Sequence, residues 1–151
     1  MKNRRSGFTI IELMVVLMVG AVLTSIAVVS FNGVSGSFAA RGARQTFMAM
    51  HARARAQAVE YGRTVQLNLD PVGDSVWLSR GSDVLEVVDF GEEFNVDVRT
   101  STGSELRVCM NARGFGDTGC NNFSSPVIVE FIITSDTASV SVRTLGQMVA
   151  N

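Results

Sequence analysis

A glycine, an aromatic residue and a carboxylate stand close together at the entrance of a long apolar run. Glu12 lies four residues after Phe8, and no charged residue occurs from Leu13 to Phe31. A carboxylate at the edge of such a run is costly unless a cation accompanies it. Cleavage of the Gly7–Phe8 bond would create that cation, the α-amino group of Phe8. Paired between neighbouring subunits, the two charges would fix the register of packed helices.

The apolar run is long enough to cross a lipid bilayer, which requires roughly 20 apolar residues in a helix. Three basic side chains lie within residues 2–5, and the next basic residue is Arg41. The positive-inside rule therefore predicts a single-pass topology with the N-terminus in the cytoplasm. A cleaved secretory signal peptide, cut near residues 37–39, is the alternative, but the apolar region of such a peptide is only about 7 to 15 residues long.

The N-terminal segment resembles the class III signal of type IV pilins and pseudopilins; it reads Gly7-Phe8-Thr9-Ile10-Ile11-Glu12-Leu13-Met14. The resemblance implies that residues 1–7 form a leader, which a prepilin peptidase removes after Gly7. It also implies N-methylation of Phe8 and a role for Glu12 in neutralising a neighbour's amine during assembly. Residues 8–31 would remain as the membrane anchor and the filament core.

A second helical segment is expected over residues 32–62. Its first residues, 32–37, are Asn, Gly, Ser and Val, which lower helix propensity. Apolar residues then recur at spacings of three and four along one face, which predicts an amphipathic helix that ends near Gly62; they are Phe47, Met50, Ala54, Ala58 and Tyr61. His51 borders this face, where a lone histidine is interpreted as a packing residue rather than a catalyst.

Residues 63–151 carry the alternation of an antiparallel β domain. A hairpin is predicted from Val65 to Leu78 with its turn at residues 71–74, and the further predicted strands are 84–90, 94–99, 106–110, 127–134 and 139–145. The fold class is therefore α+β: with the resemblance, a type IV pilin-like fold in which a long N-terminal helix packs on an antiparallel sheet.

Two cysteines, Cys109 and Cys120, enclose a loop with three glycines. Three states are open from the sequence: a disulfide, two free thiols, or a metal site. An oxidising periplasm or cell surface favours the disulfide. A metal site would need further ligands, and the one histidine, His51, is distant in sequence. We therefore expect a disulfide and no metal or other cofactor.

The resemblance extends beyond the leader. Residues 52–65 and the ending at residues 140–148 are similar to the GspH/FimT family of pseudopilins and minor pilins. One branch of that family serves the type II secretion pseudopilus, and the other serves type IV pili, including those that take up DNA. The family tail often carries Gly-Arg where this chain has Gly146 and Gln147, which weakens the DNA-uptake reading.

Charge and residue spacing argue against an enzyme and against a general nucleic-acid binder. No nucleophile, base or acidic cluster has a recognisable catalytic spacing; residues 89–93 are interpreted as a solvated acidic turn. The formal net charge is −1 with the leader, and loss of its three basic residues makes the mature chain about −4. Candidate DNA contacts are confined to scattered arginines, which are Arg41, Arg44, Arg55, Arg107, Arg113 and Arg143.

These observations predict a structural subunit rather than an enzyme. The main expectation is a minor pseudopilin of a type II secretion system, and the alternative is a FimT/FimU-like minor pilin of a type IV pilus. The expected partners are other pilins or pseudopilins, a prepilin peptidase and an inner-membrane assembly platform, with nucleic acid disfavoured. The expected location is the bacterial inner membrane with a periplasmic C-terminal domain, followed by a periplasmic or surface filament.

Processing gives the first testable prediction. When the chain is produced with a prepilin peptidase, intact-mass analysis should find a product that begins at N-methylated Phe8. Substitution of Gly7 by Ala should be tolerated, whereas Gly7→Glu should block cleavage and leave the full-length chain in the membrane. A mature chain beginning near Ala40 would instead identify a secretory signal peptide.

Overall fold

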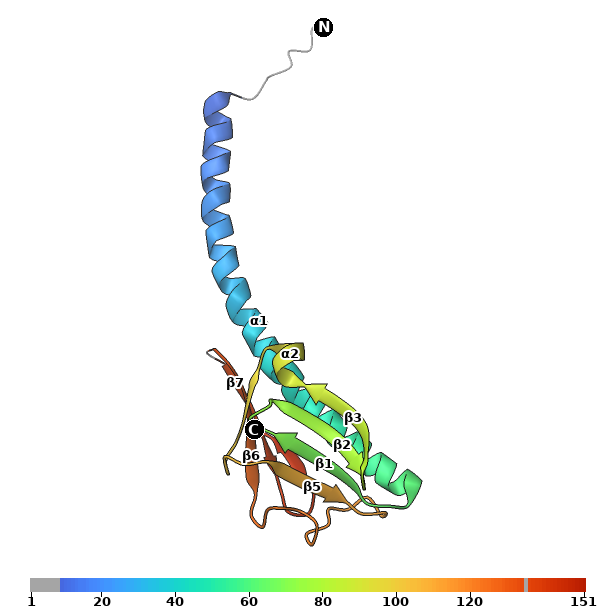
Figure 1. The fold of residues 1–151 in the computed structure, drawn as a ribbon. Coiled ribbons are helices and arrows are strands. Elements are labelled where there is room, and N and C mark those ends of the chain that lie inside the picture. Colours follow the sequence, from blue (N-terminus) through green and yellow to red (C-terminus); the bar gives the residue numbers. More distant parts are fainter. Residues whose placement is uncertain (1–8, 135) are drawn as a thin grey trace. The chain divides into compact units, whose positions relative to one another are not determined.

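The fold is described from a computed structural model of the chain (Figure 1), over residues 9–134 and 136–151. The chain divides into two compact units, Met1–Ser35 and Gly36–Asn151, which are described separately. One helix, α1 (Ile10–Tyr61), contributes to both units and runs through residues 32–37 without a break. Residues 32–37 are therefore helical despite their low helix propensity.

The larger unit contains two four-stranded antiparallel sheets. The first has the order β3-β2-β1-β5, and its strands are β1 (Val65–Asp70), β2 (Ser75–Arg80), β3 (Asp83–Asp89) and β5 (Leu106–Met110). The second has the order β4-β6-β7-β8, and its strands are β4 (Asp97–Thr100), β6 (Val127–Ile133), β7 (Asp136–Val142) and β8 (Met148–Ala150). The single sheet expected from the sequence is thus divided into two.

A short helix, α2 (Phe90–Phe94), which was not predicted from the sequence, connects β3 of the first sheet to β4 of the second. Asp89 caps it by accepting a hydrogen bond from the backbone N–H of Glu92 at 2.9 Å, and Asn95 ends it in a left-handed conformation. The acidic segment 89–93 is therefore a capped helix start and not a plain surface turn. The chain leaves β3 through this helix and enters the second sheet at β4.

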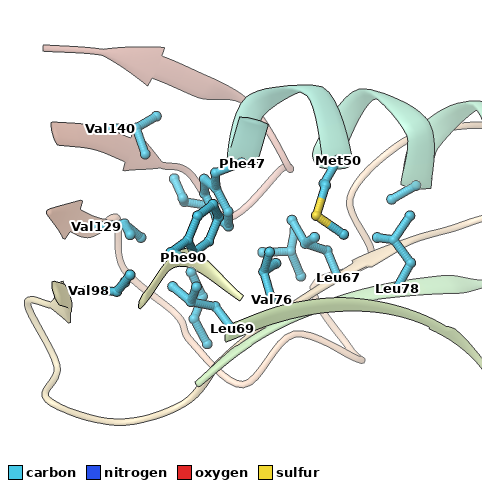
Figure 2. Close-up of a cluster of buried hydrophobic side chains, with 14 of the residues drawn as sticks. Phe47, Met50, Leu67, Leu69, Val76, Leu78, Phe90, Val98, Val129 and Val140 are labelled. Atoms are coloured by element: carbon cyan, nitrogen blue, oxygen red, sulfur yellow. The ribbon is translucent and has the colours of Figure 1, made fainter. Parts of the chain in front are cut away.

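The core of the larger unit lies where the later part of α1 meets both sheets. Phe131 of β6 joins the layers, because its ring centroid lies 5.8 Å from that of Phe47 on α1 and 5.3 Å from that of Phe90 on α2. The buried side chains labelled in Figure 2 come from α1, α2 and both sheets; they are Phe47, Met50, Leu67, Leu69, Val76, Leu78, Phe90, Val98, Val129 and Val140. A single helix face thus covers residues from two separate sheets.

The predicted helix face is confirmed except at its end. Phe47, Met50, Ala54 and Ala58 are fully buried, but Tyr61 is 46% exposed and lies beneath the guanidinium of Arg80. The helix stops there because Gly62 adopts a positive φ of 60°. Two backbone bonds then close the helix end, from Gly62 N–H to the carbonyl of Val59 and from Arg63 N–H to that of Ala58.

The C-terminal strands also differ from the prediction. β7 ends at Val142, three residues earlier than expected, because a hairpin turn begins at Arg143. The backbone N–H of Arg143 donates to the carbonyl of Gln147, and Gly146 supplies the positive φ of 73° that the turn requires. The expected tail is therefore a turn followed by the additional strand β8, which pairs with β7.

Two of the phenylalanines of α1, Phe47 and Phe38, give a matched test of this core. Phe47→Ala should lower the free energy of unfolding by roughly 3 to 5 kcal/mol, since it leaves a cavity between the sheets. Phe38→Ala on the same helix removes a side chain that is 67% exposed, so its effect should stay within about 0.5 kcal/mol. Urea unfolding followed through the fluorescence of Trp77, the one tryptophan, measures both. Equal losses would contradict this core.

Candidate assembly site

The described part of the predicted processing and assembly motif begins at Thr9, and Gly7 and Phe8 lie outside the described residues. Thr9 caps α1: its hydroxyl oxygen accepts from the backbone N–H of Glu12 at 3.3 Å, and its carbonyl accepts from Leu13 at 3.2 Å. Glu12 is exposed in the first helical turn. None of the described cations pairs with its carboxylate.

The first part of α1 exposes apolar side chains on every side. Between Ile10 and Leu23 the large ones are at least 53% exposed, and Ile10 reaches 82%. A helix that is apolar all round requires lipid or other helices around it. Among the described residues, no helical segment combines the length and the hydropathy of a membrane span. The predicted anchor, residues 8–31, includes Phe8 and side chains beyond residue 25 that lie outside the description, so it stays a prediction.

A disulfide joins Cys109 at the end of β5 to Cys120, with the two Cα atoms 5.8 Å apart. The predicted bridge is therefore present. In the described part of the chain, no group of three or more histidine, cysteine or acidic side chains is placed to hold a metal ion. The bridge closes the loop 109–120 (the disulfide loop).

The disulfide loop and the two residues after it cover the outer edge of β5. The side-chain oxygens of Asn121 and Asn122 accept from the backbone N–H groups of Cys109 and Arg107, each at 2.8 Å. The carbonyl of Cys109 accepts from the N–H of Asp117 at 2.8 Å. Side-chain amides thus take the place of a neighbouring strand, a role that the sequence analysis missed because any asparagine in a loop has the same local appearance.

The disulfide loop also touches α1 and the turn at residues 143–147 (the tail turn). The Nε of Arg55 donates to the carbonyl of Gly114 at 2.6 Å, and its guanidinium lies 5.8 Å from the centre of the Phe115 ring. Gly116 donates its N–H to the carbonyl of Leu145 at 3.2 Å. A Cβ on Gly116 would lie 2.5 Å from the Leu145 carbonyl carbon, so the close backbone approach requires glycine there.

His51 is buried beside this junction rather than placed at the border of the helix face. Burial lowers the pKa of its imidazole below the usual 6.5; the positive charge of Arg55 acts in the same direction, and a backbone hydrogen bond with Gly146 opposes them. The neutral ring is therefore the form that the fold favours. Because the folded pKa is depressed, protonation as the pH falls below 6.5 works against the fold.

The candidate DNA-contacting arginines have partners within the protein in three cases. Arg44 donates to the carbonyl of Asn151 at 3.0 Å, Arg55 holds Gly114, and Arg107 donates to the side-chain oxygen of Asn68 at 3.2 Å. Arg53, which the sequence analysis did not single out, pairs with Glu86 of β3. These side chains support the fold, which favours the structural interpretation of the arginines.

Known proteins are similar to this chain in its N-terminal motif and in its fold. Residues 2–28 match the family model of the prokaryotic N-terminal methylation motif. Two crystal structures of the type IV minor pilin FimU from Pseudomonas aeruginosa are similar in fold, with TM-scores of 0.54 and 0.55. The chain has a type IV pilin-like fold. The similarity covers 74% of this chain and 91% or 87% of the FimU chains, at 15% identity in each case. No curated protein sequence matches.

The pilin-like fold confirms the predicted architecture of a long helix packed on antiparallel strands. Together with the methylation motif, it agrees with a structural subunit rather than an enzyme. The motif also implies anchoring in the inner membrane before assembly. The minor pilin resemblance corresponds to the alternative reading of the sequence more closely than to the secretion pseudopilin that was placed first.

The disulfide loop gives a prediction for the stability of the pilin-like domain. Reduction should lower the free energy of unfolding by about 2 to 3 kcal/mol, since the closed loop restricts the unfolded chain. Urea unfolding with and without reductant measures the difference. A variant with both Cys109 and Cys120 changed to Ser is the control, because reductant should not affect it. Two alkylated thiols in protein isolated without reductant would contradict the bridge.

Proposed function

We propose that the chain is a minor pilin-like subunit of a type IV pilus, where its role is mechanical. The observation that carries this proposal is the combination of a methylation motif at residues 2–28 with a fold similar to that of a type IV minor pilin. The sequence motifs favoured a secretion pseudopilin, whereas the structural similarity supports the pilus.

Assembly begins, in this proposal, with removal of residues 1–7 and methylation of Phe8 by a prepilin peptidase. Residues 8–31 hold the subunit in the inner membrane until the assembly platform extracts it. The exposed apolar side chains from Ile10 to Leu23 then exchange lipid for the helices of neighbouring subunits. This exchange keeps the apolar surface away from water throughout.

Glu12 sets the register of packing by pairing with the Phe8 amine of a neighbouring subunit. Its position in the first turn of α1 suits a carboxylate, which the helix dipole stabilises there. No described cation competes for it. The surrounding side chains are apolar, so either charge is costly when it is buried without the other. Misaligned subunits would separate the two charges and are therefore unfavourable.

Substitution of Glu12 by Gln tests this function. The variant should be cleaved and should remain in the membrane, but it should fail to enter filaments, because one unpaired buried charge costs about 3 to 5 kcal/mol. Glu60→Gln is the matched control, since Glu60 is an exposed acid on the same helix. Immunoblots of membrane and sheared-filament fractions report cleavage, level and incorporation. Normal incorporation of Glu12→Gln would remove Glu12 from the assembly mechanism.

Deletion of the whole protein separates the two filament systems. Loss of surface pili with intact secretion of extracellular proteins is the outcome expected of a type IV pilus subunit. Loss of secretion with normal pili would instead identify a secretion pseudopilin. Restoration by the wild-type chain, but not by Glu12→Gln, would tie either phenotype to assembly.

A further inference from the structure

A cavity of about 610 Å³ lies where α1, the disulfide loop and the tail turn meet. Its lining comes from all three segments: Met48, His51 and Arg55 from α1, Phe115 from the loop, and residues 145–148 from the turn and β8. The volume falls within the range of roughly 300 to 1,000 Å³ that is typical of binding pockets. Phe115 and Leu145 are 60% and 63% exposed, so they form an apolar rim.

His51 contributes an unused hydrogen-bonding atom to this cavity. The residue is only 9% exposed, and its Nε2 has no partner in the structure. The low pKa keeps the ring neutral, and the backbone of Gly146 engages it. A neutral ring that donates one N–H keeps an acceptor on the other nitrogen. His51 therefore requires a donor that the described chain does not supply.

Arg55 contributes hydrogen-bond donors to the same cavity. Its Nε is committed to the carbonyl of Gly114, but the rest of its guanidinium faces no carboxylate among the described residues. The cavity thus combines an acceptor on His51, a donor group on Arg55 and apolar walls, with the amide of Gln147 also in its lining. A peptide unit matches this combination, because its N–H and C=O answer His51 and Arg55 while an adjacent apolar side chain contacts the walls.

We propose that this cavity receives an extended segment of a neighbouring pilin-like subunit. The segment places an apolar side chain between Phe115 and Leu145, donates a backbone N–H to Nε2 of His51, and accepts from Arg55. The inference rests on the proposed function, which supplies the neighbour. Nε2 has almost no exposed surface in the isolated chain, so binding requires side chains of the lining to shift, and the lining includes two flexible methionines, Met48 and Met148.

The alternative occupant, a nucleic acid strand, fits this cavity less well. Affinity for nucleic acid comes chiefly from several cations that contact phosphates. Among the residues that line the cavity, Arg55 is the one permanent cation, and a single cation supplies little phosphate affinity. Its other side chains are largely apolar. The lining therefore favours a polypeptide.

Photo-crosslinking of the full chain in its own cells tests the proposal. A benzophenone amino acid is placed at position 115 or 145, and at Val72 as a control in a turn that is 88% exposed and distant in sequence from the cavity. Adducts from 115 and 145, but not from 72, should map by mass spectrometry to one segment of another pilin-like subunit. Adducts to nucleic acid at these positions would overturn the proposal.

A substitution at the rim gives a second measurement. Leu145→Ser should reduce the amount of neighbouring subunit recovered with the chain roughly tenfold, because it removes an apolar contact with the side chain that the neighbour inserts. Val72→Ser should leave it unchanged, and neither should alter the level of the chain. Since His51 is the one histidine, ¹⁵N-histidine labelling should also show a shifted Nε2 resonance in assembled filaments relative to the free chain.

The outcomes separate this inference from the function on which it rests. A chain that enters filaments without adducts at 115 or 145, with unchanged recovery for Leu145→Ser, overturns the peptide-binding cavity alone. A chain that never enters filaments overturns the proposed function and the cavity together.

Discussion

Burial of one face of α1 against two separate sheets is the interaction on which the larger unit depends. The sheets share no strand, so their association relies on side chains that both sheets contribute to one core. Phe131 shows how this works, since it contacts Phe47 on α1 and Phe90 on α2. From the same helix, Arg55 binds the disulfide loop and Arg53 pairs with Glu86 of β3. The helix therefore organises the unit along its whole buried length.

The two parts of α1 share one backbone geometry but differ in how their apolar side chains are distributed around the helix. From Ile10 to Leu23 the apolar residues surround the helix, which is suited to an apolar environment made by other molecules. From Ala43 to Ala58 they follow one face, which is suited to packing on the protein's own sheets. Under the proposed function, the change in pattern along the helix separates the residues available for contacts between subunits from those that pack within one subunit.

Features determined by local sequence were predictable. The helix end at Gly62 and the hairpin from Val65 to Leu78 follow from glycine and alternation, and the disulfide was favoured by an oxidising location; the structure contains all three. Features determined by distant contacts were not. α2 buries Phe90 in the core, and Tyr61 lies outside the predicted face with Arg80 over its ring; both depend on residues that are distant in the sequence.

The candidate site divides in the same way. Glu12 could be singled out from the sequence because it is a charged residue at the start of an apolar run. The methylation motif at residues 2–28 includes this position. His51 was interpreted as a packing residue, and its burial agrees with that. Its unpaired Nε2 and the cavity around it depend on Phe115 and Leu145, about 64 and 94 residues away, which no local pattern connects to it.

The asparagines beside β5 have a further consequence if the protein packs side by side with other copies, as the proposed function requires. An open strand edge can pair with the same edge of another copy, and the risk grows when many copies are held side by side. Asn121 and Asn122 occupy the outward N–H groups of β5, and the disulfide holds them there. In the filament proposed above, covalent closure of the loop would therefore also limit pairing between copies through this edge, beyond its contribution to the stability of one molecule.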